Sequence, residues 1–488
     1  MRKNLLTLSM VISGIIGISA QKSYEVTNSV ILKNIDCQLT KTSLILPVPQ
    51  SNCYQTISNL SYSNGDILDI NNSNNKYLRE IKETNMPAQG ENSYLSETFN
   101  VTLYPMYIDM SQFETIYPYD TNSDTYKRYT INKSEYIDTN NPDIKQIAER
   151  LWSKSQDNII NYAKLCYEYV AKNYRYLNPN TGIHTIAEIL SAGGGDCGNL
   201  ASIYVNLLRA KQIPARHIVT VRPDGSYHVW ADFYLEKYGW IPVDVNMKLD
   251  DPQGNYFGYC RGDGIVMSED ICFNVEFISG ETYNTVLLQN YLFWYWCISG
   301  NNIESYHTVQ SKMLTQYQPF SIANIESNNI TLYLKQIPGA NYYKVNLFGH
   351  NNDFIKSIDN IPAENTSLVL DELTSNTKYT IECIPIRIAN NIKTQMDKYP
   401  LQFETKESST TATEVISKRN FAITASKGQI NIQLSDIAQV SIFTMTGKCI
   451  YNKKSSATMF NIHVPESILI VKITDEQGNI FTEKKNCK

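Results

Sequence analysis

One cysteine at the start of a predicted helix constrains the fold of this chain more than any other feature of its sequence. Cys197 follows three glycines and Asp196, and apolar residues recur behind it at helical spacing until Pro214. The pattern predicts a helix whose first turn contains the thiol, with Asp196 as its N-cap. A helix N-terminus favours the thiolate form, because its unpaired N–H groups and its dipole stabilise negative charge.

Three strands are predicted after this helix, in residues 217–222, 227–235 and 239–245, with turn residues between them. His228 lies in the second strand and Asp244 near the end of the third. Side chains on neighbouring antiparallel strands lie about 5 Å apart, which lets a carboxylate hold an imidazole by one ring nitrogen. Each residue alone would more often be a packing or turn residue. In this order and context they indicate a thiol nucleophile, its base and the group that orients the base, and hence acyl-transfer chemistry.

Residues 140–300 resemble the transglutaminase-like superfamily, a papain-related group of cysteine enzymes. The resemblance rests on four stretches: 195–201 (Gly-Asp-Cys-Gly-Asn-Leu-Ala), 213–216 (Ile-Pro-Ala-Arg), 228–231 (His-Val-Trp-Ala) and 240–244 (Trp-Ile-Pro-Val-Asp). It implies a papain-like α+β domain in which Cys197, His228 and Asp244 form the catalytic triad. Members of the superfamily include protein cross-linkers, peptidases and amidases, which share an acyl-enzyme step. We expect no cofactor.

Two aspects of the chemistry stay open at this level. The backbone N–H of Cys197 is one expected donor to the oxyanion, and papain-like enzymes add a donor from a side chain. Trp152 and Gln156 are the candidates for that second donor. The reaction is expected to be hydrolysis of peptide or protein amides, because water is abundant and no amine-binding tunnel is evident. The alternatives are protein-glutamine cross-linking and a catalytically silent binding or structural protein that uses the fold as a scaffold.

Composition narrows the class of protein. A chain of 488 residues is too long for one hydrophobic core and predicts three or four domains. The net charge is −5 and no basic stripe is present, so nucleic-acid binding has no support. The 34 tyrosines and the charged fraction of 19% are typical of exported, β-rich modules.

The first 20 residues have the features of a signal peptide: a charged start, an apolar core, and an acceptable cleavage site at Ile18-Ser19-Ala20 before Gln21. We therefore expect an exported protein, at the cell surface, outside the cell or in the periplasm, with no membrane-spanning segment in the mature chain. Ten cysteines allow disulfides in such a protein, and Cys37 with Cys53 and Cys260 with Cys272 are two pairings to consider. No cluster of cysteine and histidine indicates a metal site.

The expected architecture is multidomain α+β. Residues 22–135 predict an N-terminal β-sandwich, including a strand at 126–131, and residues 136–317 the catalytic domain. Within the latter range, the aromatic stretch 287–296 is expected to be a buried strand. Residues 318–405 resemble a fibronectin type III sandwich, with Leu373–Tyr379 in the position of its tyrosine corner.

The last part of the chain predicts one more module. Residues 406–420 are polar and typical of a linker, and the strand-like runs in 421–488 predict a small β-sandwich. This module resembles the C-terminal sorting domain of the type IX secretion system, on residues 445–448 and 470–473. That resemblance implies the secretion machinery as a partner, in addition to a peptide or protein substrate.

Overall fold

The computed structural model describes residues 21–177, 182–408, 421–434, 437–456, 459–465, 467–476, 478 and 480–487. The expected signal peptide and most of the expected linker lie outside these residues. The chain divides into a large unit that ends at Glu407 and a small C-terminal unit. The architecture is multidomain and rich in β-strands, as predicted. None of the described helices has the length and apolar character needed to cross a membrane.

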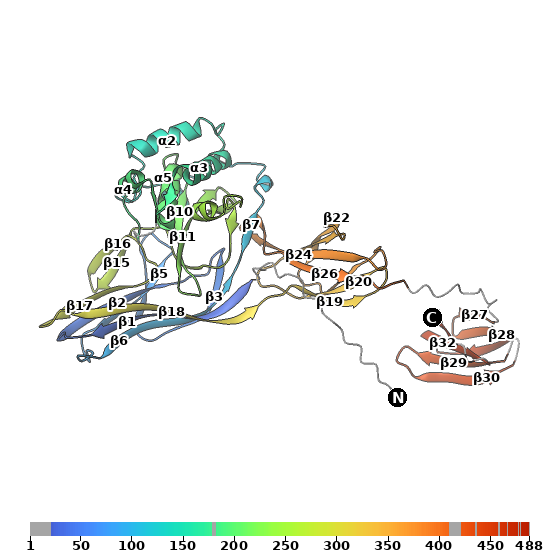
Figure 1. The fold of residues 1–488 in the computed structure, drawn as a ribbon. Coiled ribbons are helices and arrows are strands. Elements are labelled where there is room, and N and C mark those ends of the chain that lie inside the picture. Colours follow the sequence, from blue (N-terminus) through green and yellow to red (C-terminus); the bar gives the residue numbers. More distant parts are fainter. Residues whose placement is uncertain are drawn as a thin grey trace, which may run out of the picture. The chain divides into compact units, whose positions relative to one another are not determined.

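Two four-stranded sheets form the N-terminal sandwich, with strand orders β18-β1-β6-β3 and β17-β2-β5-β4 (Figure 1). Their bounds are β1 (Lys22–Asn34), β2 (Leu39–Val48), β3 (Gln55–Tyr62), β4 (Asp66–Asp69), β5 (Lys76–Lys82), β6 (Asn92–Leu103), β17 (Leu292–Cys297) and β18 (Ile303–Gln316). Alternate residues of the central strands, such as Val30, Leu44 and Leu95, are buried between the sheets. This is the period-2 pattern of a sandwich core.

The last two strands of this sandwich come from the range that we expected in the catalytic domain. β18 pairs with β1 along its whole length, from Lys22 opposite Gln316 to Asn34 opposite Ile303, and β17 pairs with β2. The domain expected to be catalytic is therefore an insertion between β6 and β17, and the predicted boundary at 317 is wrong. β17 is also a half-exposed edge strand rather than a buried one.

Residues after β6 leave the sandwich and join the inserted domain. They form β7 (Met106–Ile108), a 3₁₀ turn η1 (Met110–Gln112) and α1 (Asp124–Tyr129). The strand predicted at 126–131 is wrong, because α1 occupies most of it. The Ser123 hydroxyl caps this helix by accepting the N–H of Tyr126. Two basic residues in its last turn stabilise the negative end of the helix dipole.

The inserted domain packs helices against the sheet β12-β11-β10-β14 (Figure 1). Its helices are α2 (Pro142–Trp152), α3 (Ile159–Asn173), α4 (Ile186–Ala192), α5 (Cys197–Arg209) and α6 (Val245–Asp250). Its strands are β8 (Arg175–Tyr176), β9 (Gly194–Gly195), β10 (Ala215–Val221), β11 (Tyr227–Leu235), β12 (Gly239–Val243), β13 (Tyr259–Cys260), β14 (Ile265–Glu269), β15 (Phe273–Ile278) and β16 (Glu281–Thr285). The predicted helix at Cys197 and the three strands after it are confirmed.

Helix α5 lies at the centre of this domain. Its residues 198–209 are all buried, because the sheet covers one side and α2, α3 and α4 contact the other. Leu200, Leu207 and Leu208 belong to the same core as the buried residues of β10 and β11. A fully buried helix holds its first residue in a fixed place relative to the sheet.

The fibronectin-like module follows the sandwich. One sheet contains β19 (Phe320–Ile325), β20 (Ile330–Leu334) and β23 (Ser367–Leu370), and the other contains β21 (Tyr342–Phe348), β22 (Phe354–Pro362), β24 (Lys378–Ala389), β25 (Ile392–Gln395) and β26 (Tyr399–Glu404). The Tyr379 hydroxyl accepts the backbone N–H of Thr374 at 2.9 Å, so the predicted tyrosine corner is present. β25 also pairs with β7, which extends this sheet into the inserted domain.

The C-terminal unit is a small sandwich, in line with the strand-like runs of its sequence. Its strands are β27 (Phe421–Ser426), β28 (Gln429–Leu434), β29 (Ala438–Thr444), β30 (Cys449–Ser455), β31 (Met459–His463), β32 (Ile468–Asp475) and β33 (Ile480–Asn486). Sheets β27-β28-β31 and β30-β29-β32-β33 enclose a core that includes Ile430, Val440 and Val471.

Candidate active site

The start of α5 fixes the position of the candidate nucleophile. Cys197 is the first residue of the helix, and its thiol is partly exposed. Asp196 is the N-cap, as predicted: its carboxylate accepts the backbone N–H of Asn199 at 3.0 Å and the side-chain amide of Asn199 at 2.8 Å. The buried Asn199 amide also accepts the N–H of His184 and donates to the Gly182 carbonyl. These bonds tie the preceding loop to the first turn of the helix.

The three glycines before Asp196 are required by backbone geometry and close packing. Gly193 adopts a left-handed conformation with φ 74° and ends α4. A Cβ on Gly194 would lie 2.0 Å from the Arg175 carbonyl oxygen, and one on Gly195 would lie 2.4 Å from the Cβ of Asn199. The segment that leads to Cys197 therefore fits between β8 and α5 only without side chains.

A short hydrogen bond joins the second and third candidate residues. The Nε2 atom of His228, on β11, lies 2.6 Å from the Oδ2 atom of Asp244, directly after β12. The other carboxylate oxygen of Asp244 caps α6 by accepting the N–H of Met247 at 3.0 Å. Both side chains are largely buried. The carboxylate is thus held by two partners and fixes the orientation of the imidazole.

The environment of His228 favours its charged form. Burial by itself lowers the pKa of this imidazole, but the Asp244 carboxylate raises it through its charge and its hydrogen bond, and the Cys197 side chain raises it further. The net effect is a pKa of about 10. Because Nε2 is bound to Asp244, Nδ1 is the ring nitrogen left for the thiol. The structure therefore brings together the three residues that the sequence singled out.

A cavity of about 300 Å³ opens beside the glycine segment. Gly194 and Gly195 form one part of its lining, and the side chains around it are Leu177, His184, Glu188, Ile189 and Ala192. It combines an apolar wall with a polar rim, and it lies two residues from Cys197 in the chain. Cys197 itself is not among its lining residues.

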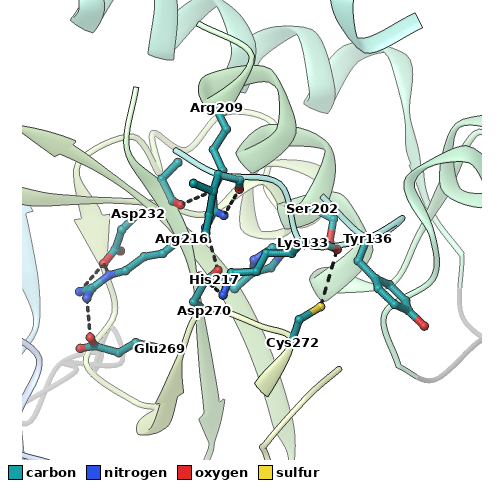
Figure 2. A network of polar contacts seen from close by, with 12 residues as sticks. Lys133, Tyr136, Ser202, Arg209, Arg216, His217, Asp232, Glu269, Asp270 and Cys272 are labelled. Atoms are coloured by element: carbon teal, nitrogen blue, oxygen red, sulfur yellow. Dashed lines mark hydrogen bonds and ion pairs between the residues drawn. The ribbon is translucent and has the colours of Figure 1, made fainter. Parts of the chain in front are cut away.

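A buried guanidinium holds the strand of His228 to its neighbours (Figure 2). Arg216 on β10 donates to Asp232 on β11 at 3.1 Å and to Glu269 on β14 at 2.5 Å. The Tyr54 hydroxyl donates to the same Asp232 at 2.6 Å. The guanidinium also lies 4.0 Å from the ring centre of Trp240 on β12. The guanidinium, which comes from β10, thus contacts the three other strands of the sheet.

A second polar cluster connects α5 to the sheet (Figure 2). Arg209, fully buried at the end of α5, donates to Asp270 at 2.8 Å and to the Ala215 carbonyl at 2.9 Å. One turn after Cys197, the Ser202 hydroxyl lies 2.9 Å from Nε2 of His217 and 3.0 Å from the Gly198 carbonyl. Burial lowers the pKa of His217 to about 4, so its imidazole is neutral. These contacts position the helix and provide no exposed reactive group.

Two other expectations are not met. Trp152 packs on Tyr162 at the end of α2, and the Lys211 ammonium lies 5.7 Å from its ring centre. Because Lys211 follows the last turn of α5, Trp152 lies at the opposite end of that helix from Cys197. Gln156 is exposed in the turn between α2 and α3. Neither residue is placed to bind an oxyanion at Cys197.

The two disulfide pairings considered from the sequence are also absent. All ten cysteines lie among the described residues, and all are free thiols. Burial raises the pKa of Cys53 to about 12 and that of Cys272 to about 11, so these two thiols are protonated at neutral pH. Spacing along the chain does not show which cysteines meet in space, because a disulfide needs a specific distance and direction between the two Cβ atoms.

Two parts of this chain match known family models. Residues 145–245 match the family model of the transglutaminase-like superfamily, and residues 409–485 match a domain of unknown function, DUF8694. An uncharacterized protein from Haemophilus influenzae is 26% identical over 151 residues, which cover 24% of this chain and 41% of that protein. The chain thus spans about two fifths of the length of this curated relative.

Solved structures that align with parts of this chain are more distant in sequence. The crystal structure of a candidate cysteine protease from Cytophaga hutchinsonii is 14% identical, with a TM-score of 0.43 over 61% of this chain and 93% of that one. A segment of two fibronectin type III domains from chicken tenascin is also 14% identical, with a TM-score of 0.15 over 34% of this chain and 97% of that one. The family match, which includes Cys197, His228 and Asp244, identifies residues 145–245 as a domain of the transglutaminase-like superfamily.

Proposed function

We propose that this protein is a cysteine hydrolase that cleaves amide bonds in peptides or proteins through a thioester intermediate. The observation that carries the proposal is the 2.6 Å contact between His228 and Asp244, with the imidazole beside the Cys197 thiol at the start of a buried helix. This arrangement supplies a nucleophile, a proton carrier and an orienting carboxylate. Its partly exposed thiol is accessible to a substrate.

The reaction follows from the positions of these groups. The Cys197 thiolate attacks the amide carbonyl carbon, an S–C bond forms, and the π electron pair moves to the oxygen. The Cys197 backbone N–H at the helix start can donate to that oxyanion. When the intermediate collapses, the C–N bond breaks and the amine leaves with the proton of the His228 imidazolium. His228 then accepts a proton from water, which hydrolyses the thioester and frees the thiol.

Selective alkylation tests whether the thiol and imidazole work as a pair. At pH 6 an ordinary thiol of pKa ~8.5 is only about 0.3% thiolate, so it reacts slowly with iodoacetamide. We expect Cys197 to react at least about tenfold faster than Cys449, the exposed thiol of the C-terminal unit. The His228→Ala variant should lose this advantage at Cys197 and leave Cys449 unchanged. Equal, slow labelling of both residues in the wild type would contradict the proposal.

Hydrolysis and cross-linking are separated by the fate of the acyl group. The purified chain is incubated with a mixture of denatured proteins in ¹⁸O-labelled water, with and without a fluorescent primary amine. We expect ¹⁸O in newly formed carboxyl groups, detected by mass spectrometry. Incorporation of the amine at glutamine, without new carboxyl groups, would instead establish the cross-linking reaction.

The pH dependence should reveal the carboxylate that charges His228. We expect activity to fall on the alkaline side only as the pH approaches 10, where the imidazolium loses its proton. In Asp244→Asn this limb should move to lower pH, because burial then acts on the imidazole without an opposing charge. A profile of kcat/KM against pH measures the shift. Asp251→Asn, which removes an exposed carboxylate that binds the Tyr256 hydroxyl, is the matched control.

The same shift predicts a change in stability. Since the pKa of folded His228 lies above its ordinary value of about 6.5, protonation stabilises the fold fully below pH ~6.5, and this contribution is lost as the pH rises to about 10. The wild type should therefore lose more of its free energy of unfolding across this window than Asp244→Asn does. An unchanged alkaline limb together with parallel stability curves would show that Asp244 does not set the charge of His228.

A further inference from the structure

The short strand β8 lies directly beside the glycine segment that leads to the thiol. β8 pairs in parallel with β9, with Arg175 opposite Gly194 and Tyr176 opposite Gly195. The N–H of Leu177 donates to the Gly195 carbonyl at 2.9 Å. Tyr176 is therefore next to Gly195, which lies only two positions before Cys197. In the chain, Tyr176 and Cys197 are 21 positions apart.

The pairing also determines the direction of the Tyr176 side chain. Residues opposite each other on paired strands point to the same face. A Cβ on Gly195 would point at Asn199, in the first turn of α5. The Tyr176 side chain thus points to the face on which α5 begins, and 43% of the residue is exposed. A substrate at Cys197 can reach it.

The surroundings keep the Tyr176 hydroxyl protonated. Burial raises its pKa above the ordinary value, and the neighbouring Cys197, Asp196 and Asp250 side chains raise it further through their negative charge. The phenol is thus a hydrogen-bond donor across the pH range in which His228 keeps its proton. The effect of Cys197 and Asp196 on this phenol also agrees with the backbone pairing, which places Tyr176 at the helix start.

Other side-chain donors are less suited to this place. Trp152 lies at the far end of α5, and Gln156 lies in the distant turn. Trp230 is on the strand of His228, and its indole N–H has no partner, but this nitrogen is buried and its ring packs edge-on against Tyr54. A substrate oxygen cannot reach that N–H without displacement of core residues.

We propose that Tyr176 is a catalytic residue whose hydroxyl donates the second hydrogen bond to the oxyanion, opposite the backbone N–H of Cys197. The inference rests on the proposed function and names a residue that the sequence did not single out. As the S–C bond forms, the oxygen gains the π electron pair and shortens its bonds to both donors. No proton moves to or from Tyr176. When the carbonyl reforms and the amine leaves, the hydrogen bonds weaken again.

Two reactions at one thiol test the role of Tyr176. Acylation of Cys197 by p-nitrophenyl acetate passes through an oxyanion, whereas alkylation by iodoacetamide does not. In Tyr176→Phe we expect acylation to be slower by about 10²-fold or more, mainly in kcat, with KM within about twofold. Alkylation of Cys197 should stay within about twofold of wild type. The control is Tyr174→Phe, two residues before Tyr176, which removes a hydroxyl that lies near Tyr169. This change should alter neither rate.

The outcomes of this experiment distinguish the oxyanion role of Tyr176 from the proposed function of the protein. Acylation within twofold of the wild type in Tyr176→Phe overturns the oxyanion role while the proposed function stands. Loss of both reactions in Tyr176→Phe also overturns it, because the residue would then position the thiol rather than bind the oxyanion. A wild-type protein that shows neither selective alkylation nor acylation at Cys197 refutes the proposed function itself, and with it the role of Tyr176.

Discussion

Replacement of Cys197 by alanine is expected to lower the rate of amide hydrolysis by about 10³-fold or more, to the level of the residual catalysis that a site without its nucleophile retains. The physical reason is that no other group at the start of α5 can form the acyl intermediate. The described residues at this end of the helix contribute backbone N–H groups, a capping carboxylate and an amide engaged in three hydrogen bonds. The measurement is kcat/KM for p-nitrophenyl acetate and for a peptide amide.

A second cysteine variant makes this test specific. Cys449→Ala removes an exposed thiol from the C-terminal unit and should leave both rates within about twofold of wild type. Thermal unfolding of Cys197→Ala should resemble that of the wild type, because the thiol is partly exposed and only borders the core. Undiminished hydrolysis by Cys197→Ala would assign the activity to another group and would also remove the basis for an oxyanion at Tyr176.

The elements of the site were predictable because their signals are local. Three glycines, an N-cap aspartate and apolar residues at helical spacing determine where α5 begins, and Pro214 limits where it ends. Turn residues separate β10, β11 and β12, and short turns make consecutive strands antiparallel neighbours. The proximity of His228 and Asp244 then follows from adjacent strands.

The missed features depend on contacts between distant parts of the chain. Nothing local in the sequence of 303–316 indicates that these residues pair with β1 at the other end of the insertion. Tyr176 lies beside Gly195 because of a two-residue parallel pairing, which is too short for any periodic pattern. At 126–131, the Ser123 cap and packing on the catalytic core favour a helix over the strand suggested by residue type. Tertiary packing decides such cases.

The buried charges were equally hidden from sequence reasoning. In the sequence, Arg216 is notable only as part of the Ile-Pro-Ala-Arg stretch that resembles the superfamily. The structure places its guanidinium among the strands of the sheet. Alternation alone predicts an apolar residue at a buried strand position. A charge there is tolerated only because acidic partners from β11 and β14 meet it in space, and a single sequence does not show such a pairing.

Replacement of Arg216 by methionine is expected to lower the free energy of unfolding by about 3–5 kcal/mol. Methionine fills much of the same volume, so the change mainly removes the positive charge and leaves the Asp232 and Glu269 carboxylates buried without their partner. Urea or thermal unfolding followed by circular dichroism measures the effect. Arg222→Met, which breaks the more exposed pair with Asp263, should cost no more than about 1 kcal/mol.

The pH dependence of this loss identifies its cause. Burial already raises the pKa of Asp232 to about 6, and the Arg216 guanidinium opposes that rise. Without Arg216 the pKa of Asp232 rises further, so the folded variant takes up a proton that the unfolded chain does not bind at neutral pH. The stability deficit of Arg216→Met relative to the wild type should therefore grow between pH 5 and pH 8, since the proton that the buried Asp232 must take up on folding becomes more costly to bind as the pH rises. A deficit that is constant over this range would mean that lost packing, rather than the unpaired carboxylates, destabilises the strand that carries His228.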